Sequence, residues 1–182
     1  MPTIGACLSL FGAAAVLALS AFDAVAEPVP VPPSPLAAMI ADPALARSDY
    51  IENCGGCHGV EGRSAPAQLP ELHGRVGYFM CTPEARAYLI RLPNIAHSRI
   101  TDNQQLADLV NYVIFGLGGT SAPAGTKPFT AAEVAHERQF ALSSVSLKAE
   151  RARHVESAIR KCRAPASLRQ LFVAPAPAHR AG

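Results

Sequence analysis

The chain has 182 residues, five cysteines and a formal net charge of +2. This length allows one domain with tails, and the small charge excludes an extended nucleic-acid-binding surface. Apolar residues make up 49% of the sequence, but only 6% are aromatic, Trp is absent and 16 residues are Pro. The composition predicts a small all-α protein with long irregular stretches.

The N-terminus contains an uncharged apolar run over residues 4–22, which is followed by Ala24-Val25-Ala26. A small-x-small pattern after such a run predicts a signal peptide over residues 1–26. No Lys or Arg precedes the run, which is unusual for a signal peptide. The run is also long enough for an uncleaved membrane anchor, and contact with a membrane is expected only if the signal is not cleaved. Cys7 lies at the start of the run, which argues against lipidation. Residues 27–41 are expected to form an extended Pro-rich linker.

The sequence Cys54-Gly55-Gly56-Cys57-His58 carries the clearest chemical signal. Cys-x-x-Cys-His is typical of c-type haem attachment. Two thiols one helical turn apart can each add to a haem vinyl group, and the adjacent His can bind the iron as the proximal ligand. A redox dithiol or half of a zinc site is the alternative, but the trailing His favours haem. We therefore expect one covalent haem c, with its iron, at Cys54, Cys57 and His58.

The segment before this motif predicts a helix that begins with Asp42 as N-cap and Pro43 at its first position. Ala46 and Tyr50 stand eight and four residues before Cys54, on one helical face. In these positions the stretch resembles the N-terminal helix of the class I (mono-haem) cytochromes c, the family of the small periplasmic c-type cytochromes. The resemblance implies a close crossing with a later helix, in which Tyr112 lies near Ala46.

A second resemblance follows the motif. Pro70-Glu71-Leu72-His73-Gly74 begins twelve residues after His58 and is similar to a pattern of mitochondrial-type cytochromes c. The resemblance implies that the Pro70 carbonyl accepts a hydrogen bond from His58 Nδ1, which would fix the imidazole tautomer. It also implies that Leu72 packs on the porphyrin.

Two further helices complete the predicted haem domain, residues 42–120. Thr82 and Pro83 open a helix over residues 84–92. Arg86 and Arg91 in this helix either pair with the propionate groups of the haem or are ordinary surface charges. A capping box from Thr101 to Gln104 precedes a helix that resembles the last helix of the cytochrome c fold, with Gly116 as its stop.

Residues 121–172 are predicted to form a C-terminal helical extension. Thr130 and Glu133 form a capping box, and Phe129 and Val134 a hydrophobic staple, ahead of a helix that ends near Phe140. A second amphipathic helix is expected over residues 147–162, packed over the haem domain. Residues 173–182 are expected to be disordered.

The sixth iron ligand departs from the family pattern, because the loop over residues 92–100 contains no Met. His97 in that loop and Met80 are the two candidates, and an open or water-bound iron is the third possibility. Haem attachment would leave Cys81 and Cys162 in the mature chain. In an oxidising compartment these two are expected to form a disulfide, with two unpaired buried thiols as the alternative.

The resemblance and the motif together predict a periplasmic electron carrier and not an enzyme, although it could serve as a subunit of an oxidoreductase. The expected partner is a redox protein, such as a periplasmic dehydrogenase, and neither a nucleic acid nor a small-molecule substrate is indicated. The alternatives are a five-coordinate haem protein that binds a gas or peroxide, and a thiol oxidoreductase that uses Cys54 and Cys57.

Overall fold

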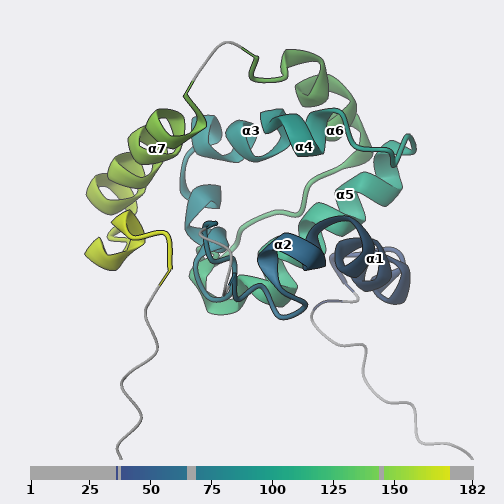
Figure 1. The fold of residues 1–182 in the computed structure, drawn as a ribbon, viewed down its shortest axis with the longest axis horizontal. Coiled ribbons are helices and arrows are strands. Elements are labelled where there is room, and N and C mark those ends of the chain that lie inside the picture. The colour runs from purple at the N-terminus through teal and green to yellow at the C-terminus, as the bar shows by residue number, and fades with distance from the viewer. Residues whose placement is uncertain (1–35, 37, 65–68, 144–145, 173–182) are drawn as a thin grey trace, which may run out of the picture. The chain divides into compact units, whose positions relative to one another are not determined.

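The computed structural model describes residues 36, 38–64, 69–143 and 146–172 (Figure 1). The predicted signal peptide, Cys7 and the predicted disordered tail lie outside the described residues, as does most of the predicted linker. Every regular element in the described ranges is helical, which confirms the all-α class. In this part of the chain, none of the helices has the length and apolarity that a bilayer crossing requires.

Helix α1 (Pro43–Tyr50) begins as predicted, because the Asp42 carboxylate accepts hydrogen bonds from the N–H groups of Ala44 and Leu45. The chain continues through a π-helical turn (Ile51–Gly55) into α2 (Gly56–His58). The Cys-x-x-Cys-His motif therefore lies on helical backbone. Gly59, with φ of +75°, ends this helical stretch in a conformation that favours glycine.

A 3₁₀ helix (Val76–Cys81) leads into α3 (Pro83–Arg91). The Thr82 hydroxyl accepts a hydrogen bond from the N–H of Ala85 at 3.2 Å, so the predicted cap is confirmed. Pro93 ends α3 and begins the short helix α4 (Pro93–Ala96), as its missing N–H and fixed φ favour.

Helix α5 (Asn103–Asn111) begins one residue later than predicted. The N-cap is Asp102, whose carboxylate accepts a hydrogen bond from the N–H of Gln105 at 2.8 Å. The prediction of Thr101 as the cap was wrong, because the ionised carboxylate of the next residue is a stronger acceptor than the Thr101 hydroxyl. Gly116 is not the stop either, since it lies inside a π-helical turn (Tyr112–Leu117) that continues the helix.

Helices α1 and α5 cross as the resemblance implied. Ala46 and Ala107 are buried and small, which allows the two backbones to approach closely. The rings of Tyr50 and Tyr112 pack with centroids 5.8 Å apart. Gln105 Nε2 also donates to the Asp49 carboxylate at 2.9 Å. Helix α6 (Ala131–Glu137) packs against α5 and also contacts α3, and α3 contacts α4 (Figure 1).

The extension contains α6 (Ala131–Glu137) and α7 (Leu147–Cys162), and a 3₁₀ turn (Arg138–Phe140) follows α6. Thr130 accepts a hydrogen bond from Glu133 N–H at 3.2 Å, and the bounds of α7 are those predicted. Phe129 and Val134 are both buried, as the staple requires. The Asn111 side chain of α5 donates a hydrogen bond to the Phe129 carbonyl and accepts one from the Phe129 N–H, which fixes this segment against α5.

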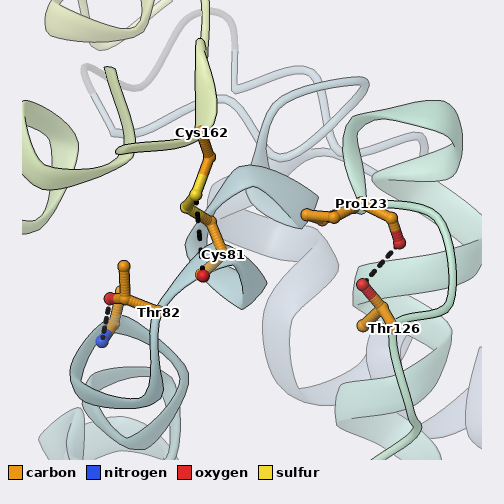
Figure 2. Close-up of a disulfide and its surroundings, with 6 residues drawn as sticks. Cys81, Thr82, Pro123, Thr126 and Cys162 are labelled. Carbon is orange, nitrogen blue, oxygen red and sulfur yellow. Dashed lines mark hydrogen bonds between the residues drawn. A yellow bond between two sulfur atoms is a disulfide. The ribbon is translucent and has the colours of Figure 1, made fainter. Parts of the chain in front are cut away.

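Residues of the predicted haem domain and of the extension share one hydrophobic core, which includes Leu106, Ile114, Val155, Ala158 and Leu168. Cys81 and Cys162 form a disulfide with Cα atoms 6.1 Å apart (Figure 2). The predicted pairing is therefore confirmed. It joins the end of the 3₁₀ helix Val76–Cys81 to the end of α7.

Candidate functional site

A cavity that is partly open to solvent lies between the Cys-x-x-Cys-His motif and the rest of the core. Cys54 and His58 line it, together with Tyr50 of α1. Most of the remaining wall is apolar and comes from several elements: Val76, Phe79, Leu89, Leu92, Ile95, Leu109, Val110, Val113, Ile114 and Leu168.

The imidazole of His58 is held at the cavity wall by the main chain. Its Nδ1 lies 3.1 Å from the carbonyl oxygen of Pro70, so the hydrogen bond implied by the resemblance is present. This bond leaves Nε2 as the nitrogen free to bind a metal. Burial lowers the pKa of His58 and outweighs the opposite effect of the Pro70 carbonyl. The neutral imidazole, which is the form that binds metals, is therefore favoured.

The segment that carries Pro70 is fixed by backbone hydrogen bonds. The N–H groups of Leu72 and His73 both donate to the carbonyl of Gly62, at 2.9 and 3.1 Å. Pro70 and Leu72 line the cavity, as does Glu71 between them. Tyr50 supports the other side of the motif, because its hydroxyl donates a hydrogen bond to the carbonyl of Gly59 at 2.6 Å. Mainly because it is buried, the pKa of Tyr50 is raised to about 12.

The two motif cysteines are free thiols with different surroundings. Cys54 is half-buried in the cavity wall, whereas Cys57 is exposed. Burial raises the pKa of Cys54, and the nearby Cys57 adds to this effect. The disulfide of Cys81 and Cys162 uses a separate pair. The structure thus leaves both motif sulfurs available for thioether bonds.

Neither candidate for the sixth ligand lines the cavity. His97 is exposed at the end of α4. Met80 is buried among the core side chains, while its neighbour Phe79 reaches the cavity. Among the described residues that line the cavity, His58 is the one imidazole and there is no Met.

Two arginines that sequence reasoning missed line the cavity, namely Arg75 and Arg151. Both are buried. The two arginines that the sequence offered as propionate partners lie elsewhere: Arg86 pairs with Glu133, and Arg91 pairs with Glu137 at 2.7 Å. Arg86 and Arg91 thus join α3 to α6 and do not line the cavity. Arg75 directly follows Pro70-x-Leu-x-Gly, which was a usable signal, but no local pattern pointed to Arg151.

These residues fit a covalently attached haem. A covalently attached haem needs an apolar cavity, two free thiols and an oriented imidazole. The structure places Cys54 and the oriented imidazole of His58 in the wall of an apolar cavity, and the second thiol, Cys57, is exposed on the same helical stretch. The buried cations Arg75 and Arg151 suit a cofactor that also carries carboxylates.

Comparisons with known proteins agree with this fit. Two cytochromes c-552 of Thermus thermophilus are similar to the chain: one is 27% identical over 128 residues, which cover 59% of this chain and 86% of the relative. The other is 26% identical over 115 residues, which cover 54% of this chain and 88% of the relative. These likenesses support a c-type cytochrome. No family model and no solved structure matches the chain.

Proposed function

We propose that this protein is a periplasmic mono-haem cytochrome c that carries single electrons. The observation that carries the proposal is the wall formed by Cys54 and His58, where the imidazole is oriented by the Pro70 carbonyl at the edge of an apolar cavity. When bound, the haem would supply an iron that cycles between the ferric and ferrous states. The likeness to cytochromes c-552 supports the same function.

The chain's own residues would do three things for such a cofactor. Cys54 and Cys57 would hold it covalently, and His58 would bind the iron through Nε2. The Pro70 carbonyl raises the basicity of the imidazole, which favours the ferric state. The apolar wall, with Leu72 and Phe79 among its members, would exclude water and raise the potential.

The signal peptide predicted for residues 1–26 supports export, and a disulfide between Cys81 and Cys162 suits an oxidising compartment. We infer a redox protein as partner, either a periplasmic dehydrogenase or a respiratory component. In this role the protein would be a carrier or an electron-transfer subunit and would have no substrate of its own.

The function is tested by the mass and colour of the exported protein. The chain is produced with a c-type maturation system, denatured and measured by intact mass and by acid–solvent extraction. We expect the mass of one added haem and colour that stays with the polypeptide. Cys54→Ala/Cys57→Ala should lose both. The matched variant Cys81→Ser/Cys162→Ser removes the other two cysteines and should keep both.

Protein that carries no haem, or colour that passes wholly into the organic phase, would overturn the proposal. The haem-free result combined with rapid consumption of thiol reagents by Cys54 and Cys57 would instead favour the thiol oxidoreductase.

One observation favours a second candidate, a five-coordinate haem protein that binds a gas or peroxide. Neither His97 nor Met80 is part of the cavity wall. Addition of carbon monoxide to the reduced protein separates the two functions, since an open iron should bind it rapidly and a six-coordinate carrier slowly or not at all. Spectra of His97→Ala and Met80→Ala identify the sixth ligand: only the variant that loses a ligand should show a changed ferric spectrum.

A further inference from the structure

The C-terminal extension forms part of the cavity wall. Helix α7 packs against the 3₁₀ helix Val76–Cys81, and the disulfide fixes this contact (Figure 2). After α7 the chain turns at Arg163, with φ of +57°, and forms a 3₁₀ turn (Ala166–Arg169). Leu168 of this turn is buried and lines the cavity, as does Arg151 of α7.

Arg151 and Arg75 meet at this wall from distant parts of the sequence. Arg75 Nη2 donates to the carbonyls of Ser167 and Gln170, each at 2.7 Å. Arg151 Nη2 donates to the carbonyls of Leu168 at 3.0 Å and Gln170 at 3.4 Å. The two guanidinium groups therefore share the Gln170 carbonyl. All these acceptors are neutral.

Neither Arg75 nor Arg151 forms an ion pair with a carboxylate of the described residues. Burial lowers the pKa of Arg75, and the charge of Glu71 opposes this shift. Glu71 lines the same cavity and also pairs with Arg63 at 3.4 Å. The Nε of Arg75 is buried without a hydrogen-bond partner. Two like charges in an apolar wall are costly without a counter-ion.

We infer that Arg75 and Arg151 bind the propionate carboxylates of the haem, so that the C-terminal extension completes the haem pocket. This inference rests on the proposed haem attachment. Cys54 and His58 line the same cavity as Arg75 and Arg151, so a cofactor attached there would have its two carboxylates in a cavity that also contains two cations. Arg is suited to this because its planar fork can bind a carboxylate through two hydrogen bonds.

A cation beside the haem would also act on its potential. Reduction lowers the net charge of the iron centre by one, and a nearby positive charge favours the reduced state. Removal of the Arg151 charge should therefore stabilise the ferric state. The holoprotein with Arg151→Gln is expected to show a ferric-to-ferrous ratio about tenfold higher at fixed potential, equivalent to a midpoint about 59 mV lower.

The experiment compares four holoproteins by redox titration and by the resonance Raman bands of the propionates: wild type, Arg151→Gln, Arg151→Lys and Arg153→Gln. Arg153 lies on the same helix with an exposed side chain, so its loss should change neither measurement. Arg151→Lys keeps the charge but not the planar fork, so it should keep most of the potential while the propionate bands shift. If Arg151→Gln does not fold, Arg151→Met replaces it as a variant of similar length without charge.

The inference would be overturned if the midpoint potential of Arg151→Gln were within error of the wild-type value. It would also be overturned if the potential of Arg151→Lys fell as far as that of Arg151→Gln, because this would indicate a purely structural role for Arg151. Addition of succinate tests whether the two arginines bind a free dicarboxylate instead of the haem propionates. If succinate changes the potential of the wild type and the propionate bands are unchanged in Arg151→Gln, the inference is also overturned. Intact mass separates this failure from failure of the proposed function, because it reports covalent haem in every variant.

Discussion

His58 Nδ1 lies 3.1 Å from the main-chain oxygen of Pro70, although the two residues are twelve positions apart. This contact joins the helical Cys-x-x-Cys-His motif to the segment that carries Leu72 and Arg75. An imidazole held in this way can present only Nε2 to a metal. The contact therefore makes the placement of Pro70 a determinant of the ligand's basicity, and it can be tested through the residues that position Pro70.

Gly62 is the residue through which this placement can be changed. It has φ of +72°, and a Cβ at this position would lie 3.1 Å from His73 N and 3.2 Å from Leu72 Cβ. Gly62→Ala should lower the free energy of unfolding by about 1–2 kcal/mol, because an L-residue resists the left-handed region. It should also raise the midpoint potential by weakening the His58–Pro70 bond. Urea unfolding and redox titration measure the two effects.

Gly56→Ala is the matched control for this substitution, since a Cβ there meets nothing within 4 Å. Gly56 lies in α2, so the alanine should leave stability unchanged or raise it by up to about 1 kcal/mol. Equal stability of the Gly62 and Gly56 variants would show that the Gly62 turn is not under this constraint.

The disulfide between Cys81 and Cys162 closes a long loop, with a sequence separation of 81. Its loss in Cys81→Ser/Cys162→Ser should lower the free energy of unfolding by about 4 kcal/mol, because the unfolded chain gains the entropy of an open loop. Urea unfolding of the oxidised wild type and of this variant gives the difference. Wild type treated with a reductant should match the variant, and a difference below about 1 kcal/mol would contradict the prediction.

Arg86 should affect stability but not the potential of the proposed haem. Its guanidinium pairs with Glu133, donates to the carbonyls of Lys127 and Pro128, and lies 4.0 Å over the Phe129 ring. Arg86→Ala should cost about 1–2 kcal/mol in unfolding free energy, because several partly exposed charge-assisted bonds are lost. The potential should not change. Arg99, which is exposed, provides the control Arg99→Ala with little effect on either quantity.

His154 should make stability depend on pH. It is buried, its ring packs against Tyr88 with centroids 4.6 Å apart, and its Nε2 lies 3.9 Å from a Glu150 oxygen. Burial, aided by the charge of Arg153, lowers the pKa of His154, while Glu150 and Glu84 oppose the shift. The unfolded chain then takes up the proton first as the pH falls through about 6.5. Stability is complete above that pH and is lost below it.

His154→Phe, which keeps a ring against Tyr88, should reduce this acid loss. The difference between the wild-type and variant unfolding free energies, measured from pH 7.5 to 5, isolates His154 from the other histidines. His136→Gln removes an exposed histidine of α6 and should retain the acid loss of the wild type. Parallel curves for wild type and His154→Phe would contradict the assignment.

The elements themselves were largely predictable from the sequence, because their signals act over a few residues. Asp42, Thr82 and Thr130 cap helices as predicted, and α7 has its predicted bounds. The error at Thr101 was also local, since Asp102 is an equally good acceptor one residue further on. The resemblance of Pro70-Glu71-Leu72-His73-Gly74 to the mitochondrial-type pattern implied the contact with His58, and the structure contains it.

The sequence by itself determined the proposed attachment chemistry, because two thiols and an imidazole at fixed spacing indicate covalent haem wherever the rest of the chain lies. Only the tertiary structure decided which side chains face the cavity. It left His97 exposed and Met80 in the core, and it brought Arg151 to the same wall as Arg75. These placements depend on how α7 packs and on a disulfide across 81 positions, and periodicity within a single helix does not encode such long-range contacts.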